Sequence, residues 1–533
     1  MRGRKRKYIV ILGSMMSGLG KGILTSSIGR ILQSKGMSVV PIKFDGYLNV
    51  DCGTMNPFRH GEVFVLDDGT ECDMDLGTYE RFLNMDLGGE NNPTGGKIFK
   101  RILEKERRGE FLGGDVQFVP HLTNEIKEWI RRIGDKFNAD VILTEVGGTV
   151  GDLENGYFIE AMRQLSLEED VLFIQLTYVP SLFLGEPKTK PTQHATRLLT
   201  SMGVQPHMLF CRESEQLTDG AKEKISMFCN VPKEAIFDDP ILKTIYELPL
   251  ILEKQRVSGI LLKKLGLKAE NGDFRKWGAL VEKVKRPKKR ITIAITGKYT
   301  AVADAYVSIK EALVHAGAHL GIGVNKKWIE TTAIEEGRMT LDVLDDCDGI
   351  IVPGGFGKRG VEGKIACIEH ARKNKIPFLG LCLGMQLAVI EYARHVCGMK
   401  GANSTEFDQK TQYSVIDLLP EQRKIQTKGA TMRLGGHDVL IKKGTVAHGA
   451  YKKSVVRERF RHRYEVNPDY VKALVKKGFV FSGKASKEEN IMQIGEIPNH
   501  PFFVGTQFHP EFTSRLERPH PLFISFLREA GKR

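Results

Sequence analysis

The sequence predicts an α/β protein with two doubly wound domains, each built on a largely parallel sheet that helices cover on both faces. Short apolar runs rich in Val and Ile alternate with longer stretches of helical periodicity, a pattern typical of parallel sheets buried on both sides. The 533 residues suffice for roughly two to four domains of about 150 residues each. Hydrophobic residues make up 41% and charged residues 27% of the chain, which excludes an intrinsically disordered protein.

The predicted strands lie on either side of a polar segment. In the N-terminal part we expect strands at 8–12, 38–43, 141–146, 171–179 and 207–211. In the C-terminal part we expect them at 291–296, 349–353, 377–381 and 502–505. Residues 266–290 contain Glu270-Asn-Gly-Asp273 and a basic run from 283 to 290, which indicates a linker. The predicted organisation is therefore a domain over 1–268, a linker over 269–290 and a second domain over 291–533.

The chain carries an excess of basic residues, with 79 Lys and Arg against 65 Asp and Glu, for a net charge of +14. Such an excess suits nucleic acid, an acidic membrane surface or nucleoside triphosphates, and charge alone leaves these alternatives open. No apolar run approaches the roughly 18 residues of a membrane-spanning helix, and the N-terminal apolar run is too short for a signal peptide. The eight cysteines include no C-x-x-C pair, so we expect neither disulfides nor a zinc ribbon, and a cytoplasmic location.

A glycine-rich loop after the first strand predicts a phosphate site. The loop runs from Gly13 to Gly22 before a helix expected over 23–36, so backbone N–H groups can face phosphate oxygens while Lys21 reaches the terminal phosphates. The match to the standard P-loop is imperfect, because Met15 stands at the first glycine position and Gly22 at that of the Mg²⁺-binding Ser or Thr. A strand-to-helix turn that binds nothing is the alternative.

Charged residues at other strand ends support a site for ATP and Mg²⁺. Lys43 ends the second strand and Glu145 lies at the end of the third, where ligands of open α/β sheets gather. Asp73 and Asp75 lie in a polar loop, where each acid taken singly is also compatible with a solvated or capping carboxylate. The run Lys188-Thr-Lys-Pro-Thr-Gln193 combines cations with hydroxyls, which suits a second triphosphate as well as an exposed turn.

The C-terminal domain carries the pattern of a cysteine nucleophile. Strand 377–381 leads into Gly380-Leu-Cys-Leu-Gly384 and then a helix, which is a nucleophile elbow with Cys in place of Ser. Backbone N–H groups at that helix N-terminus and in Pro353-Gly-Gly-Phe-Gly357 can form an oxyanion hole. Further along, Gln507-Phe-His-Pro-Glu511 supplies a histidine base and a carboxylate to orient it. Although most single cysteines are structural, the joint pattern predicts a triad of Cys382, His509 and Glu511.

With these motifs the chain resembles the CTP synthase family over nearly its whole length. The C-terminal half resembles class I glutamine amidotransferases, which implies a flavodoxin-like domain, and the N-terminal half resembles the P-loop-like synthase domain. That half matches in longer stretches: Ser17–Gly22, Asp51–Pro57, His60–Val65, Lys105–Gly109, Glu145–Asp152 and Lys188–Gln193. The resemblance implies the last step of de novo CTP synthesis, in which ATP phosphorylates UTP at O4 and ammonia from glutamine, or free ammonia, displaces the phosphate.

The resemblance also assigns residues to each ligand. For ATP these are Gly18, Leu19, Gly20, Lys21, Gly22, Ile23 and Asp75. For UTP or CTP they are Ser17, Asp152, Leu153, Glu154, Lys188, Thr189, Lys190, Pro191, Thr192, Gln193 and Lys224. For glutamine they are Gly355, Leu383, Gly384, Met385, Gln386, Glu406 and Arg463. Lys43 would support phosphoryl transfer, Asp75 and Glu145 would ligate Mg²⁺, and His60 and Val63 would line an ammonia gate.

The resemblance further implies regulation and assembly. It implies activation by GTP near Lys358-Arg-Gly360, feedback inhibition by CTP and a homotetramer with nucleotide sites at subunit junctions, with neither nucleic acid nor membrane as a partner. The sequence departs from the family pattern at Gly18 (often Ser), Gly46 (Pro), Gly95 (Thr), Phe99 (Tyr) and Asn155-Gly-Tyr157 (Ser-Leu-Pro). These departures bear on nucleotide affinity and feedback strength.

Two other functions compete with this interpretation. A ligase with the same glutaminase could act on a non-uracil acceptor, but it would not need the second triphosphate segment at 188–193. A nucleic-acid-binding P-loop protein would suit the charge of +14, but it would leave the triad unexplained.

Overall fold

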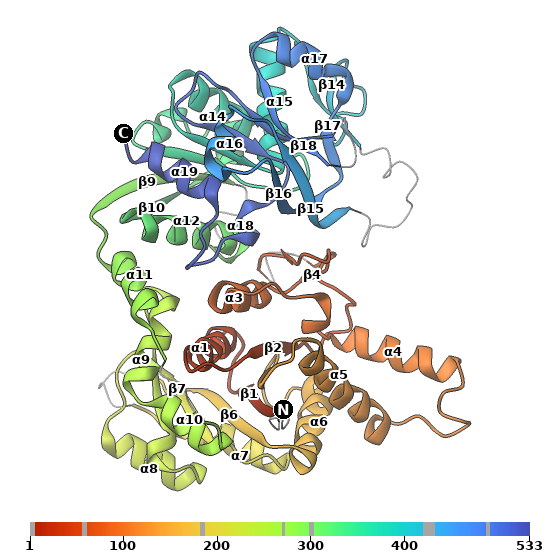
Figure 1. Cartoon of the computed structure of the whole chain (residues 1–533), viewed down its shortest axis with the longest axis vertical. Helices are drawn as coiled ribbons and strands as arrows, with labels where there is room; N and C mark the ends of the chain where they lie inside the picture. The colour runs from red at the N-terminus through yellow and green to blue at the C-terminus, as the bar shows by residue number, and fades with distance from the viewer. Residues whose placement is uncertain are drawn as a thin grey trace. The chain divides into compact units, whose positions relative to one another are not determined.

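The computed structural model describes residues 6–55, 61–181, 187–268, 272–297, 303–418, 432–486 and 491–533. These residues form two compact units, and each is described by itself (Figure 1). The first unit comprises Met1–Cys52 and Thr78–Val281, and the second comprises Gly53–Gly77 and Glu282–Arg533. The segment from Gly53 to Gly77 thus groups with the C-terminal half, although it lies early in the sequence.

The first unit is built on a six-stranded sheet of the described residues, with the order β2-β5-β1-β6-β7-β8 and parallel pairing throughout. Its strands are β1 (Lys7–Gly13), β2 (Val39–Phe44), β5 (Val141–Val146), β6 (Val171–Tyr178), β7 (Met208–Glu213) and β8 (Ile236–Pro240). Residues Tyr8 to Leu12 of β1 are at most 2% exposed, because helices cover both faces of this central strand. The loops after β1, β5 and β2 therefore meet at one edge of the sheet, where ligands of such folds bind.

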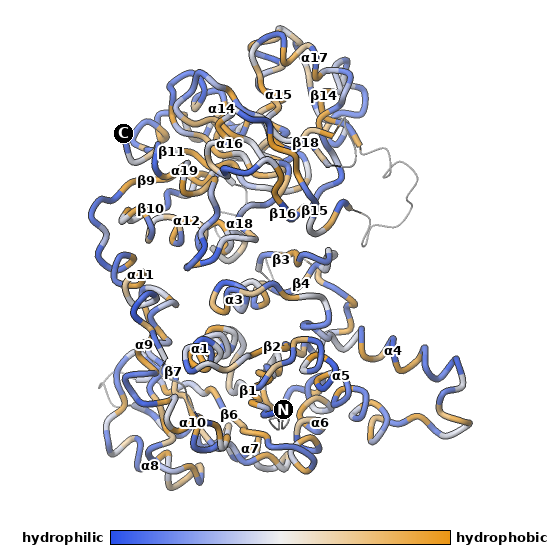
Figure 2. Tube along the Cα trace, viewed as in Figure 1, coloured by the Kyte–Doolittle hydropathy of each residue, from blue (hydrophilic) through white to orange (hydrophobic). Residues whose placement is uncertain are grey.

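Helices of the first unit connect these strands. They are α1 (Lys21–Ser34), α4 (Gly95–Arg107), α5 (Thr123–Lys136), α6 (Gly156–Glu168), α7 (Lys190–Ser201), α8 (Asp219–Cys229), α9 (Leu248–Lys254) and α10 (Val257–Leu265). Helices α3 (Met74–Leu83) and α11 (Arg275–Lys285) lie at the boundaries of the unit. Hydrophobic and hydrophilic residues alternate along α4 and α5 (Figure 2). No helix among the described residues combines the length and the apolar character needed to cross a bilayer.

Helix α11 lies in the segment interpreted from the sequence as a linker. Trp277 of this helix is 1% exposed, and its indole Nε1 donates a hydrogen bond to the carbonyl oxygen of Tyr246 at 2.8 Å. Its ring also packs against those of Tyr246 and Phe82. This part of the segment is therefore an ordered helix packed into the first unit.

The second unit contains a nine-stranded mixed sheet in the part of the chain that the structure describes, with the order β10-β9-β11-β12-β20-β19-β18-β15-β16. Its strands are β9 (Lys289–Gly297), β10 (Ile322–Glu330), β11 (Gly349–Val352), β12 (Phe378–Leu381), β15 (Arg433–Ile441), β16 (Val455–His462), β18 (Val480–Ala485), β19 (Met492–Glu496) and β20 (Phe503–Thr506). Pairing is parallel from β10 to β20 and antiparallel from β20 to β16.

Smaller elements complete the second unit. The short strands are β3 (Phe64–Val65), β4 (Glu71–Cys72), β13 (Asn403–Ser404), β14 (Ser414–Leu418) and β17 (Tyr464–Val466). The helices are α12 (Val307–Leu320), α13 (Thr331–Glu335), α14 (Val361–Lys373), α15 (Leu383–His395), α16 (Val446–Tyr451), α17 (Pro468–Lys476), α18 (Pro510–Thr513) and α19 (Pro521–Ala530). Side chains of β9 alternate between two cores: Ile293 and Ile295 pack on one face of the sheet, and Ala294 packs on the other.

The predicted fold class is confirmed, and each predicted strand corresponds to an observed one. The sequence prediction omitted β8, β10 and the antiparallel strands β15, β16, β18 and β19. These strands carry polar or charged residues, as in Lys326 and Lys327 of the edge strand β10, and so lack the continuous apolar pattern of the buried parallel strands.

Candidate functional site

Cys382 occupies the sharp turn between β12 and α15. Its φ of 50° and ψ of −100° are unusual for a residue other than glycine, and its backbone N–H donates to the carbonyl oxygen of Thr506 at 2.7 Å. The flanking glycines are required by space: a Cβ at Gly380 would lie 2.8 Å from the Gly384 carbonyl oxygen, and one at Gly384 would overlap the carbonyl oxygen of Val352. The nucleophile elbow predicted from the sequence is thus a strained turn that only small neighbours permit.

His509 and Glu511 complete the predicted triad at the start of α18. His509 Nδ1 lies 2.7 Å from Glu511 Oε1, and both side chains are buried. Burial alone would lower the pKa of His509, but the negative charge of Glu511 and the neighbouring Cys382 raise it to about 10. The imidazole is therefore protonated at neutral pH, which suits a proton donor for a leaving amine.

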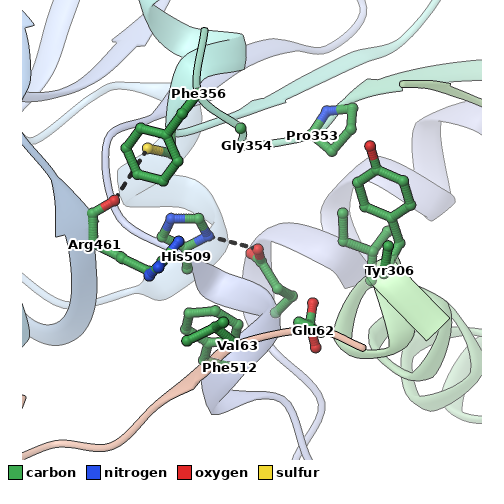
Figure 3. A pocket seen from close by; sticks show the side chains of 14 residues that line it. Glu62, Val63, Tyr306, Pro353, Gly354, Phe356, Arg461, His509 and Phe512 are labelled. Atoms are coloured by element: carbon green, nitrogen blue, oxygen red, sulfur yellow. Dashed lines mark hydrogen bonds and ion pairs between the residues drawn. The ribbon is translucent and has the colours of Figure 1, made fainter. Parts of the chain in front are cut away.

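The three triad residues line one pocket of about 110 Å³ in the second unit (Figure 3). The ring of Phe512 stacks on that of His509 at a centroid distance of 4.8 Å, and Val63 also lines the pocket. The loop from Pro353 to Phe356 forms another wall, where a Cβ at Gly354 would lie 2.9 Å from His509 Cε1. The pocket therefore brings the predicted oxyanion loop next to the nucleophile and its histidine.

The predicted ammonia-gate residue Val63 lies in this pocket, whereas His60 lies outside the described residues. Neighbouring Glu62 also lines the pocket, and its Oε2 accepts hydrogen bonds from the backbone N–H of Ser308 at 3.0 Å and from the Ser308 hydroxyl. Ser308 is in the first turn of α12, so a carboxylate caps that helix N-terminus and anchors the segment that carries Val63.

Two of the predicted glutamine-binding residues lie at this loop, since Gly355 belongs to it and Glu406 contacts it. Glu406 Oε1 accepts a hydrogen bond from the N–H of Gly357 at 2.8 Å. The pKa of Tyr464 is raised, mainly by burial and further by the charge of Glu406, while the charge of Arg463 acts to lower it. The carboxylate of Glu406 and the guanidinium of Arg463 thus lie near the same tyrosine. A carboxylate can pair with the α-amino group of an amino acid, and a guanidinium can pair with its α-carboxylate. Leu383, Gly384, Met385 and Gln386 form the buried first turn of α15, with Gln386 only 3% exposed.

In the first unit, the glycine-rich loop joins β1 to α1. Gly18 and Gly20 have φ values of 71° and 102°, and Gly20 caps the helix N-terminus. Lys21 extends back over the loop, so that its Nζ donates to the carbonyl oxygen of Gly148 at 2.6 Å. Leu19 is buried, whereas Ile23 is half-buried. The loop and its lysine therefore lie at the carboxyl edge of the sheet, as the sequence predicted.

Glu145 lies in the same region, directly opposite Lys43 in the pairing of β5 with β2. Its Oε2 accepts hydrogen bonds from the hydroxyls of Thr25, at 3.0 Å, and Tyr79, at 2.5 Å. Lys43 Nζ lies 3.4 Å from Asp45 Oδ1, and both side chains are buried. Asp75, the other predicted metal ligand, begins α3 in the second unit, so its part in one site with Glu145 stays a prediction.

The predicted pyrimidine-nucleotide residues occupy several loops and helix starts of the first unit. Thr189, Thr192 and Gln193 are buried, and α7 begins at Lys190, so the run 188–193 is largely the first turn of a helix. Asp152 Oδ2 accepts from the N–H of Thr149 at 2.7 Å. The remaining residues of this set are exposed or half-buried: Ser17, Leu153, Glu154, Lys188, Lys190, Pro191 and Lys224.

Three of the departures from the family pattern contact one another. A Cβ at Gly95 would lie 2.7 Å from the Tyr157 hydroxyl and 2.9 Å from the Gly46 carbonyl oxygen. A Cβ at Gly46 would overlap Asn155 Oδ1. The glycines thus leave room for the larger Asn155 and Tyr157 behind the segment from Asp152 to Glu154, and the departures form one repacked cluster.

Several residues of these sites were not singled out from the sequence. Arg212, at the end of β7, donates from Nε to the carbonyl oxygen of Leu19 at 3.1 Å and supports the glycine-rich loop. Thr25 and Tyr79 hold Glu145, and Arg461 offers its carbonyl oxygen to Cys382 Sγ at 3.6 Å. Only Arg212 carried a usable signal, because it directly follows the predicted strand 207–211 at the edge where ligands gather.

Comparisons with known proteins agree with this geometry. Residues 7–267 match the family model described as CTP synthase N-terminus, and residues 301–529 match the one described as glutamine amidotransferase class-I. The CTP synthase of Methanopyrus kandleri is 51% identical over 531 residues, which cover 98% of this chain and 99% of that protein. The CTP synthase of Archaeoglobus fulgidus is 52% identical over 530 residues, which cover 99% of this chain and 98% of that protein.

Among solved structures, the glutaminase domain of Trypanosoma brucei CTPS with bound acivicin matches 46% of this chain and 94% of that chain, at 37% identity and a TM-score of 0.42. The two family models together extend over most of the sequence, and the curated relatives cover it almost entirely. The chain belongs to the CTP synthase family.

Proposed function

We propose that this chain converts UTP to CTP at the expense of ATP, with ammonia taken from glutamine or directly from solution. The observation that carries the proposal is the buried Cys382–His509–Glu511 arrangement in one pocket, in a chain similar over its whole length to CTP synthases. The triad supplies the nitrogen, and the glycine-rich loop of the first unit supplies a place for the triphosphate.

Glutamine hydrolysis follows from the triad. The Cys382 sulfur attacks the side-chain amide carbon of glutamine, so a C–S bond forms and the carbonyl electron pair moves onto oxygen. Collapse of this intermediate breaks the C–N bond, and protonated His509 gives its proton to the nitrogen, which leaves as ammonia. Neutral His509 then takes a proton from water as the water oxygen attacks the thioester. The C–S bond breaks, its electron pair returns to sulfur, and glutamate is released.

The amination takes place in the first unit. The UTP O4 oxygen attacks the γ-phosphorus of ATP and releases ADP; ammonia then adds at C4, and phosphate leaves to give CTP. Backbone N–H groups from Gly18 to Ile23 and the ammonium of Lys21 would bind the ATP phosphates, and Lys43 would offset the charge of the transferred group. Residues 152–154 and 188–193, with Ser17 and Lys224, would hold the pyrimidine nucleotide.

Mg²⁺ fits the oxygen-rich surroundings of Glu145. This buried carboxylate accepts hydrogen bonds from two hydroxyl groups and lies opposite Lys43 in the sheet, and a hard cation takes such oxygen ligands together with triphosphate oxygens. Glu145 would hold the ion, with Asp75 as the second protein ligand. When bound, Mg²⁺ would neutralise phosphate charge and orient the γ-phosphate for attack.

Regulation and assembly form the finer part of the proposal. GTP would activate near Lys358 to Gly360, which lead into the N-terminus of α14, and CTP would inhibit by taking the pyrimidine-nucleotide residues. Exposed apolar side chains support self-association into a homotetramer: Leu112 is 94% exposed, Leu153 is 93% exposed and Phe118 is 57% exposed. Nucleoside triphosphate substrates and a thiol nucleophile suit a cytoplasmic enzyme.

Replacement of the nucleophile tests the proposal. In Cys382→Ala, glutamine-dependent CTP formation should fall by at least about 1,000-fold, whereas ammonium-dependent formation should stay within about twofold of the parent. Cys397→Ala, at a half-buried cysteine two residues beyond the end of α15, is the matched control and should retain both activities. Loss of both activities in a folded Cys382→Ala protein would contradict two separable reactions.

A further inference from the structure

We propose that Gln507 is a further catalytic residue of the glutaminase, and that its side-chain amide stabilises the Cys382 thiolate. This inference rests on the proposed function, because it assigns a role within the thiol chemistry of that site. Gln507 follows β20 and is fully buried, and its backbone N–H donates to the carbonyl oxygen of Gln493 at 2.9 Å. Its Nε2 lies 3.6 Å from Cys382 Sγ, within the usual range of hydrogen bonds to sulfur.

The orientation of the Gln507 amide is set by a chain of donors and acceptors. The chain starts at the carbonyl oxygen of Tyr464, which can only accept, so the end of Gln386 that faces it at 2.7 Å must be the nitrogen. The same Nε2 lies 3.3 Å from Gln507 Oε1, so that end of Gln507 must be the acceptor. The other end of the Gln507 amide is therefore the N–H donor, and it points at the sulfur.

A second contact of the sulfur has the opposite polarity. The Arg461 carbonyl oxygen lies 3.6 Å from Cys382 Sγ, where it accepts the S–H of a neutral thiol but repels a thiolate. The Gln507 N–H is the complementary partner, because it attracts the thiolate and gains little from the neutral thiol. The Arg461 carbonyl thus favours the neutral thiol, and the Gln507 N–H favours the thiolate. Gln507 therefore counteracts the repulsion between the carbonyl oxygen and the reactive thiolate.

The thiolate occurs twice in the reaction, so this donor acts twice. Sulfur supplies an electron pair when the C–S bond to glutamine forms, and it recovers that pair when water breaks the thioester. A neutral amide suits both steps, because it stabilises charge on sulfur without providing a proton that would quench the nucleophile. Gln386, which orients Gln507 and does not contact the sulfur in these interactions, is a positioning residue in this scheme.

Three variants of the full-length enzyme test the inference. Gln507→Met keeps the approximate shape and removes the donor, and Gln507→Glu places a carboxylate next to the sulfur. Gln493→Met is the matched control, since Gln493 is equally buried next to Gln507 and has no hydrogen bond to the thiol among the described contacts. Iodoacetamide is the probe, and peptide mass spectrometry follows alkylation of Cys382 between pH 5 and pH 10. Ammonium-dependent CTP formation reports whether each variant is folded.

We expect the pH midpoint of Cys382 alkylation to rise by about one unit or more in Gln507→Met and further in Gln507→Glu. Glutaminase kcat/KM should fall roughly 10- to 100-fold in Gln507→Met, with the ammonium-driven rate retained. An unchanged alkylation midpoint in both Gln507 variants, or an equal shift in Gln493→Met, would overturn the inference. Alkylation of Cys382 needs neither UTP nor glutamine, so the alkylation midpoint tests the role of Gln507 separately from the proposed function. Failure of the proposed function would instead appear as a lack of glutaminase activity in the parent enzyme.

Discussion

The guanidinium of Arg212 donates from Nε to the carbonyl oxygen of Leu19 at 3.1 Å, and so supports the glycine-rich loop from the end of a neighbouring strand. The same guanidinium lies 3.2 Å from Asp239 Oδ1 and donates to the carbonyl oxygen of Pro240 at 3.2 Å. The glycine-rich loop is thereby connected to the ends of β7 and β8. Arg212, Asp239 and Pro240 belong to no local motif, so their connection to the loop becomes visible only in the folded chain.

The support from Arg212 makes two glycines of the loop differ in what they tolerate. A Cβ at Gly20 would overlap Arg212 Nη2 at a φ of 102°, whereas one at Gly18, with φ of 71°, meets nothing within 4 Å. Gly20→Ala should therefore cost about 1–3 kcal/mol of stability and raise the KM for ATP, while Gly18→Ala should cost only about 1 kcal/mol of backbone strain. Thermal unfolding and ATP titration of both variants check this. Equal losses of stability and equal changes in the KM for ATP would show that the overlap with Arg212 does not distinguish the two glycines.

Glutamine hydrolysis should depend on pH through His509. The pKa of about 10 keeps the imidazole protonated across the neutral range, and the proton is lost as pH rises through that value. Glu511→Gln removes the largest of the influences that raise this pKa, so the alkaline limb of glutaminase kcat/KM should move to lower pH by about 1–3 units. The pH profile of ammonium-driven CTP formation serves as the control and should stay the same. A glutaminase profile that does not move would contradict the assignment of its alkaline limb to His509.

Glu213 should make the stability of the first unit depend on pH. Burial, then the neighbouring Asp238, raise its pKa to about 9, and the side chain is 1% exposed. Because the folded pKa lies above the ordinary value of 4.5, Glu213 costs no stability below about pH 4.5 and an increasing amount up to about pH 9. Glu213→Gln should therefore stabilise the protein by about 1–3 kcal/mol at pH 7 and by little at pH 4.5. Denaturant unfolding at both pH values tests this, and Glu215→Gln, at an exposed neighbouring residue, is the control. A gain in stability that does not depend on pH would contradict ionisation of buried Glu213 as its cause.

Glu145 is the carboxylate through which Mg²⁺ dependence should act. In Glu145→Gln, the Mg²⁺ concentration for half-maximal ammonium-driven CTP formation should rise at least about 10-fold, because one negative ligand is lost. Glutaminase activity, which belongs to the other unit, should change little. Glu80→Gln provides the control, since Glu80 is also buried and accepts a hydrogen bond from the N–H of Leu87. An unchanged Mg²⁺ titration in Glu145→Gln would exclude this residue as a ligand.

The parts of the sites that follow from local sequence were predictable. The elbow around Cys382 needs glycines two residues away on each side, and the phosphate loop needs residues that adopt positive φ, so both leave a pattern in a few consecutive residues. Strands such as β1 and β5 are buried on both faces and stand out as continuous apolar runs. These features predict the fold class, the elbow cysteine and the phosphate loop before any tertiary contact is known.

Contacts between distant segments were not predictable. Glu71 pairs with Arg461 at 2.7 Å and the carbonyl oxygen of Val65 accepts from Arg459 at 3.2 Å, each across about 390 residues, so only folding places the segment 53–77 in the second unit. The orientation of Gln507 likewise depends on Tyr464 and Gln386, which no motif connects to it. Such relationships depend on tertiary geometry, and a single sequence carries no local signal for them.

The most direct test of the account is CTP formation by the unmodified enzyme from UTP, ATP and Mg²⁺, with ammonium chloride or with glutamine plus GTP in parallel reactions. We predict CTP from both nitrogen sources, with equal amounts of ADP and phosphate, and one glutamate for each CTP when glutamine is the source. CTP from ammonium alone would contradict the coupling of the two units. No CTP from either source in folded protein would contradict the assignment of UTP as the acceptor.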